Sequence, residues 1–193
     1  MQSRSASVRA VVLAVLLFAV GVAAAASNDD IGVTVHTRDG LVIIDVDLPL
    51  DVTPEEAWPT ISDYDRMSEF IPNLTESRIL SRDGNRLRVQ QKGTTSRGPF
   101  TFSFENVRDV VLVPPTEIRT ELVSGSLRSA RSITRVVRTE TGSRLHNHGE
   151  YLPAPWIPAS VATSMIADET REQFGRIRAE IMRRKGRIAS STP

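Results

Sequence analysis

The middle of this chain alternates apolar and polar residues, and one long helical segment follows, which constrains the fold more than any other feature. For about eighty residues no helical periodicity occurs, and short alternating segments recur between turn-forming residues. In residues 100–107, for example, Phe100, Phe102 and Phe104 share one face, and polar residues occupy the other. This pattern is typical of an antiparallel sheet with one face in water.

The helical segment covers residues 159–184, after a proline-rich connection. At about 1.5 Å per residue it would be roughly 37 Å long, longer than any predicted strand, so it can lie across the whole sheet. We expect residues 186–193 to form a disordered polar tail. The apolar stripe of the helix consists of Val161, Met165, Ile166, Phe174, Ile177 and Ile181.

The segment before the sheet predicts a hairpin and two short helices. Residues 31–37 and 41–48 alternate, and Asp39-Gly40 between them is a strong turn signal. Thr53 and Glu56 then form a capping-box pattern with Pro54 at the first helical position. A second short helix is expected over residues 63–70.

The first 26 residues have the layout of a secretory signal peptide. A basic start with Arg4 and Arg9 precedes an apolar run over residues 10–22, and small residues follow. We expect cleavage after Ala24 or Ala26 and a mature protein in an exported compartment, which would be the bacterial periplasm. The apolar run is shorter than the about 20 residues that span a bilayer, but a retained anchor stays an alternative.

Composition excludes several functions. The chain has 24 basic and 23 acidic side chains, so no overall charge attracts it to nucleic acid. It has no cysteine, and therefore no disulfide and no thiolate nucleophile. No phosphate-binding loop or nucleophile elbow occurs, and nothing in the sequence calls for a cofactor.

The predicted element order is a strand, two short helices, six antiparallel strands and a long C-terminal helix. Residues 52–80 contain the motifs Ala57-Trp58, Asp63-Tyr64, Phe70-Ile71-Pro72-Asn73 and Ser77-Arg78-Ile79-Leu80. This combination resembles the START-like (SRPBCC) superfamily, which includes polyketide cyclases, plant allergen-type ligand carriers and coenzyme Q-binding proteins. The resemblance covers about residues 41–185, within a domain of residues 27–185. It implies an α+β helix-grip fold, in which a curved antiparallel sheet wraps the last helix and leaves a cavity. The strand over residues 31–37 and the export signal depart from the cytosolic members.

We predict that this cavity binds a small hydrophobic ligand such as a lipid or a polyketide-like molecule. The expected inward faces are apolar but interrupted by polar residues, and Gly93 and Gly149 remove side-chain volume there. A solid core with the polar residues near its rim is the alternative. The predicted lining consists of Leu87, Val89, Phe100, Phe102, Phe104, Val161 and Met165, with polar contacts from Gln91, Asn147 and Tyr151.

Two other functions stay open. In one, the chain is a cyclase or dehydratase that uses the same cavity with Tyr151 as the acid, although a lone tyrosine is weak support for catalysis. In the other, it is a ligand-free interaction module that uses an arginine-rich strand face including Arg131 and Arg135. The sequence leaves the oligomeric state open.

Two clusters have competing interpretations. His146, His148 and Glu150 alternate on one strand, and such a set can bind a divalent metal. Because Leu145 and Tyr151 occupy the opposite face, we expect the histidines to face water and predict no metal site. In the loop before the last helix, Trp156 and Ile157 either contact a membrane transiently or plug the end of the sheet.

Overall fold

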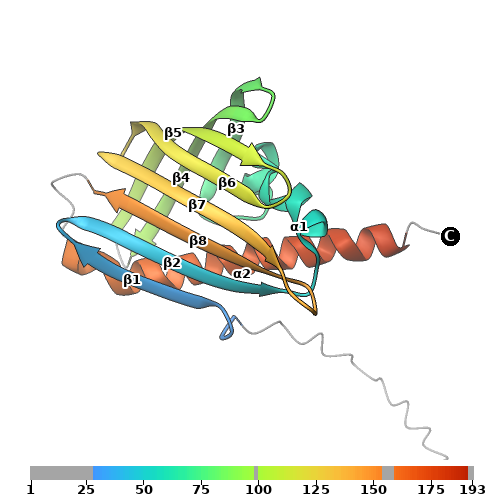
Figure 1. Cartoon of the computed structure of the whole chain (residues 1–193). Coiled ribbons are helices and arrows are strands. Elements are labelled where there is room, and N and C mark those ends of the chain that lie inside the picture. The colour runs from blue at the N-terminus through green and yellow to red at the C-terminus, as the bar shows by residue number, and fades with distance from the viewer. Residues whose placement is uncertain (1–27, 98–99, 154–158, 191–193) are drawn as a thin grey trace, which may run out of the picture.

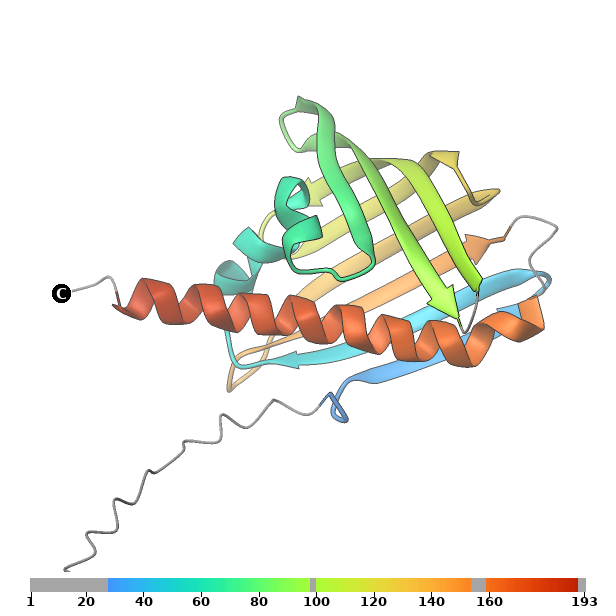
Figure 2. The same cartoon turned by 180° about the vertical axis from the view of Figure 1, so that it is seen from behind.

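The computed structural model describes residues 28–97, 100–153 and 159–190 and shows a curved antiparallel sheet with one long helix across its concave side (Figures 1 and 2). The strand order is β1-β2-β8-β7-β6-β5-β4-β3. This α+β architecture confirms the predicted helix-grip fold. In chain order the elements are β1 (Gly32–Arg38), β2 (Leu41–Leu50), α1 (Pro54–Ile61), η1 (Tyr64–Glu69), β3 (Leu74–Asp83), β4 (Arg86–Arg97), β5 (Phe100–Val113), β6 (Glu117–Gly125), β7 (Ser129–Arg138), β8 (Ser143–Leu152) and α2 (Ala159–Ser190).

The N-terminal hairpin forms as the turn signal predicts. Asp39 and Gly40 adopt positive φ angles of 51° and 80°, which match the right-handed twist of the strands in a two-residue turn. In β2 the side chains of Val42, Val46 and Leu48 are buried. The hairpin therefore places β1 at the edge of the sheet, next to β2, and α2 contacts both strands.

Local sequence also sets both short helices. The Thr53 side chain accepts from the backbone N–H of Glu56, and the Glu56 carboxylate accepts from the backbone N–H of Thr53, so the predicted capping box is present. The second segment is a 3-10 helix, η1, and it contributes Tyr64 and Met67 to the core. Together α1 and η1 cover one end of the sheet (Figure 2).

The long helix continues beyond the predicted end. It begins at Ala159 as expected but reaches Ser190, so residues 186–190 are helical and not part of a disordered tail. It contacts α1, β1 and β2. At the opposite edge of the sheet, the Asn73 amide donates to the Glu169 carboxylate, which joins the start of β3 to the helix.

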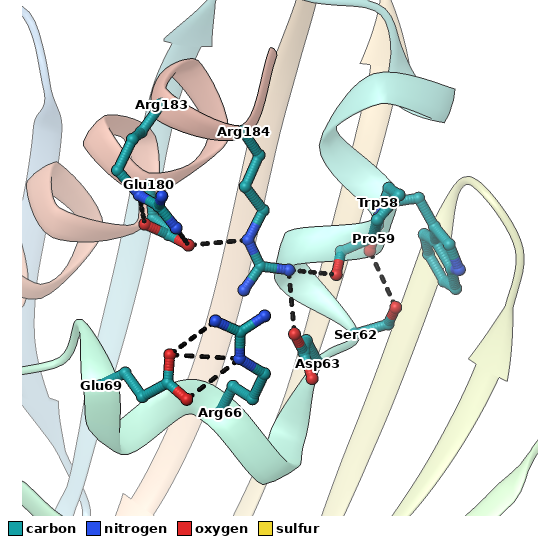
Figure 3. Close-up of polar contacts among 9 residues, drawn as sticks. All are labelled: Trp58, Pro59, Ser62, Asp63, Arg66, Glu69, Glu180, Arg183 and Arg184. Atoms are coloured by element: carbon teal, nitrogen blue, oxygen red, sulfur yellow. Dashed lines mark hydrogen bonds and ion pairs between the residues drawn. The ribbon is translucent and has the colours of Figure 1, made fainter. Parts of the chain in front are cut away.

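Charged groups fasten α2 to the two short helices (Figure 3). Glu180 is only 8% exposed, and it accepts from the guanidinium groups of Arg183 and Arg184 at 2.7 Å. Arg184 also donates to the Asp63 carboxylate at 2.9 Å and to the carbonyl oxygen of Pro59 at 3.1 Å. Because these partners belong to α1 and the residues that follow it, the network fixes the angle at which α2 crosses the sheet.

Candidate functional site

The concave face of the sheet is closely packed at the end near α1. Leu48, Leu145 and Val136 follow one another across neighbouring strands and are each at most 2% exposed. Ser143 lies in the same region, and its hydroxyl donates to the carbonyl oxygen of Val52 at 2.7 Å. Ile181 of α2 is 1% exposed and completes this packing. This end of the molecule leaves no room for a ligand among these side chains.

Toward the start of α2, the same face becomes polar and half-buried. The Asn147 amide donates to the Thr134 hydroxyl, and the hydroxyls of Thr120 and Ser132 are 2.8 Å apart. All four residues are half-buried although they point to the helix side of the sheet. Strand register makes Asn147 the inward neighbour of buried Leu145, so the change from filled to accessible occurs within one strand. Accessible polar groups on a concave face are the expected lining of a ligand pocket.

Three of the predicted lining residues lie nearer the filled end. Leu87 and Val89 are 3% and 1% exposed and belong to the core. Gln91, the predicted polar contact on the same strand, is 7% exposed, and its amide donates to the Ser77 hydroxyl at 3.2 Å and lies 3.5 Å from the Met67 sulfur. The Gln91 amide is therefore already bonded within the core and is not held free for a ligand.

Aromatic side chains fill the volume at both glycines, which corrects the reasoning that these glycines leave empty space. A Cβ at residue 149 would lie 2.5 Å from the Tyr151 hydroxyl oxygen and 2.6 Å from its ring, so the ring lies over Gly149. Phe104 lies over Gly93 in the same way. Phe104 and Tyr151 are both half-buried on the concave side. The glycines therefore allow the rings to pack directly against the backbone and do not enlarge the pocket.

The remaining predictions lie outside what the structure describes. Phe100 and Phe102 belong to β5, and Val161 and Met165 to α2, but their side chains fall outside the described residues. The loop with Trp156 and Ile157, and residues 1–26 with the predicted signal peptide, also fall outside them.

Arg108 is a site residue that the sequence analysis missed. It pairs with Val89 of β4 and lies two residues from buried Val110, so its side chain is on the concave face. Its Nε is buried without a hydrogen-bond partner among the described residues. The alternation of the strand could have revealed it, because residues 104, 106, 108 and 110 lie on the same face. The predicted strand ended at residue 107, and Arg108 was therefore left out.

Two tyrosines sense the charge of Arg108. Burial raises the pKa of Tyr64 to about 12, and the positive charge of Arg108 acts in the opposite direction. Burial also raises the pKa of Tyr151, again opposed by Arg108. Tyr64 comes from η1, which contacts the edge strand β3, and Tyr151 comes from β8, nearer the other edge of the sheet. Arg108 therefore lies within electrostatic reach of both walls of the interior.

The histidine cluster lies on the convex face, as expected. His146 and His148 are exposed, and His148 Nδ1 is 2.7 Å from the Asp45 carboxylate. This hydrogen bond, with help from Glu150, raises the pKa of His148 above its ordinary value, against a smaller effect of burial. Glu150 also forms an ion pair with Arg131 at 2.6 Å. Among the described residues, no three histidine or acidic side chains are arranged to hold a metal ion.

In the part of the chain that the structure describes, no helix has both the length and the apolar character needed to cross a bilayer.

Comparison with known proteins gives one family match and several structures of the same architecture. The family model described as polyketide cyclase / dehydrase and lipid transport matches residues 50–175 of the chain. A STAR-related lipid transfer protein from Xanthomonas axonopodis has a TM-score of 0.62 at 10% identity, covering 80% of this chain and 99% of that one. The Zhui aromatase/cyclase from Streptomyces sp. R1128 has a TM-score of 0.63 at 9% identity, covering 75% and 95%.

The protein TTHA0849 from Thermus thermophilus is similar to the same extent, with a TM-score of 0.62 at 12% identity over 78% of this chain and 99% of that one. No curated protein matches the sequence. At these identities the solved structures show the shared fold alone. The family match, by contrast, spans most of the chain, from the end of β2 into the middle of α2.

Proposed function

Because the chain belongs to the polyketide cyclase/dehydrase and lipid transport family, we propose that it binds a small hydrophobic ligand between the concave face of its sheet and α2. Its role would be to carry or sense this ligand. The family, which includes lipid transport proteins, and the similar lipid transfer protein support ligand binding in general terms. They leave the identity of the ligand to be found by experiment.

The change in packing along the concave face is the observation that carries this proposal. Leu145 and Val136 are 1% and 2% exposed, whereas Asn147 and Thr134, the next inward residues on the same two strands, are half-buried. A closely packed interior would bury all four positions equally. The half-buried positions supply amide and hydroxyl groups on the same face of the sheet as the Phe104 and Tyr151 rings. Such a mixture orients an apolar molecule that has a few polar atoms.

A cyclase or dehydratase reaction in the same pocket is the second candidate. It is favoured by one observation, the electrostatic coupling of Tyr64 and Tyr151 to Arg108 inside the sheet. Both phenols are protonated at neutral pH, as a tyrosine with its ordinary pKa also is, so either one can donate a hydrogen bond to a bound carbonyl group. Turnover of a bound polyketide analogue would distinguish this function from carriage.

Native mass spectrometry with lipid extraction, on the chain purified from its own host, tests the binding proposal. We expect a stoichiometric apolar molecule to co-purify, and the mass of the chain also shows whether residues 1–26 were removed. A cavity-filling variant, Ser132→Phe, should lose this molecule. The matched control Ser124→Phe places the same bulk at an exposed position of β6 and should keep it. If the two variants co-purify with equal amounts of this molecule, the proposed pocket is wrong.

A further inference from the structure

Arg108 is a cation on the inner face of the sheet without a counter-charge among the residues that the structure describes. Its strand neighbours there are Val89 of β4 and Leu122 of β6. It forms no hydrogen bond or ion pair with any residue that the structure describes, and its Nε is buried. Arg108 as a whole is half-buried, and a buried N–H donor without a partner is costly, so folding alone gives no reason to keep an arginine at this position.

The acids close to Arg108 in sequence all face the other way. Asp109 points to the convex face, where its carboxylate accepts from Arg88 at 2.8 and 2.9 Å. Glu105 is also on the convex face and lies 3.9 Å from Lys92. On the concave side, the described positions of β4, β5 and β6 that surround Arg108 are apolar or neutral. The outer Arg88 is thus paired with Asp109, whereas Arg108 on the inner face has no such partner among the described residues.

Two phenol groups lie within electrostatic range of this cation. Tyr64 and Tyr151 are close enough to feel its charge, yet no hydrogen bond joins either side chain to Arg108 within the described residues. A guanidinium group offers five N–H donors and no acceptor, and a protonated phenol offers one O–H donor besides an oxygen that can accept. A buried guanidinium N–H without an acceptor among the described residues, with phenols in electrostatic range that can also donate, suits an oxygen that carries negative charge.

We propose that Arg108 binds the anionic oxygen group of the ligand, so that the pocket selects an apolar molecule with one acidic group, such as a long-chain carboxylate. This inference rests on the proposed function and narrows it. The ligand supplies the counter-charge that the protein lacks, and its apolar part lies along the half-buried side of the pocket with Phe104. An alcohol of the same length fills the same space but leaves the guanidinium unpaired.

Competition with a neutral fluorescent probe, N-phenylnaphthylamine, tests this selectivity. The competitors are dodecanoic acid, dodecyl phosphate and dodecanol, which share one alkyl chain. We expect the wild-type chain to bind at least one of the two acids about tenfold or more tightly than the alcohol, which corresponds to about 1.4 kcal/mol. The tighter of the two acids shows whether a carboxylate or a phosphate is the preferred group.

Three variants assign the effect to Arg108. Arg108→Met should lose the preference for the acid and keep its affinity for dodecanol, and Arg108→Lys should retain part of the preference. Arg88→Met is the matched control, because Arg88 lies on the adjacent strand, faces outward and pairs with Asp109. It should bind all three competitors as the wild type does.

Thermal unfolding separates this role from a structural one. Because Arg108 has no hydrogen bond or ion pair to lose within the described part of the chain, Arg108→Met should unfold at the wild-type temperature or above it. A markedly lower unfolding temperature would assign Arg108 to stability and overturn the inference. So would equal affinity of the wild type for the acids and the alcohol, although ligand binding itself would then stand. If neither the probe nor any competitor binds, the proposed function fails, and this inference fails with it.

Discussion

The Glu180 carboxylate gives a quantitative prediction about how α2 is held. Hydrogen bonds from Arg183 and, to a smaller extent, Arg184 lower the pKa of Glu180 to about 2, although burial acts in the opposite direction. The ordinary value is 4.5. A difference of this size corresponds to about 3 kcal/mol of unfolding free energy at pH 7. Arg183 is 47% exposed, so solvent screens part of this interaction, and we expect about 2 to 3 kcal/mol.

The substitution Glu180→Gln removes the charge and keeps the shape. Because the folded pKa lies below the unfolded one, the stabilisation is complete above the unfolded pKa and disappears as the pH falls through the folded pKa. The difference in unfolding free energy between wild type and Glu180→Gln should be largest at pH 7. At pH 3 it should fall to less than half of that value, about 1 kcal/mol.

Urea unfolding at several pH values measures this difference. The control is Glu172→Gln on the same helix, whose carboxylate is 57% exposed and lies 3.6 Å from Arg176. Such an exposed pair contributes about 0.5 kcal/mol or less. If Glu180→Gln loses no more stability than Glu172→Gln, or if its loss is the same at pH 3 and pH 7, the network does not fasten α2 in the way we describe.

Further substitutions test the packing of the Tyr151 ring on Gly149 and the His148–Asp45 hydrogen bond on the convex face. Gly149→Ala should lower the unfolding free energy by about 1 to 3 kcal/mol, because the new Cβ displaces the Tyr151 ring. Gly186→Ala, at a position with open space around it, should raise the unfolding free energy by up to about 1 kcal/mol. Urea unfolding compares the two variants. His148 should titrate above pH 6.5 in an NMR titration, and Asp45→Asn should lower its midpoint. Since the folded pKa is raised, the stabilisation from His148 is present below pH 6.5 and is lost as the pH rises through the folded value; an unchanged midpoint in Asp45→Asn would contradict this assignment.

Local signals in the sequence predicted most of the fold. The Asp39-Gly40 turn and the capping box at Thr53 depend on residues that are close in the chain, and both are present. Alternation placed Leu87, Val89 and Gln91 on the inner face of β4, where all three are buried. The motifs of the two short helices and the element order were sufficient for the superfamily.

The end of α2 shows where local signals become weak. Gly186 and the polar residues after it gave no reason to extend the helix, but the helix continues to Ser190. A helix that is already held by tertiary contacts adds further turns at little cost, because its nucleation has already occurred elsewhere. Propensity alone therefore placed the end too early.

The sequence by itself determined which residues face the interior, because strand parity is a local property with a period of two. The tertiary structure decided what those positions do. It placed the Tyr151 ring over Gly149, filled one end of the concave face with Leu145 and Ile181, and left Arg108 inside without a partner among the described residues. Packing depends on contacts between distant strands and α2, and no single segment of the sequence contains that information.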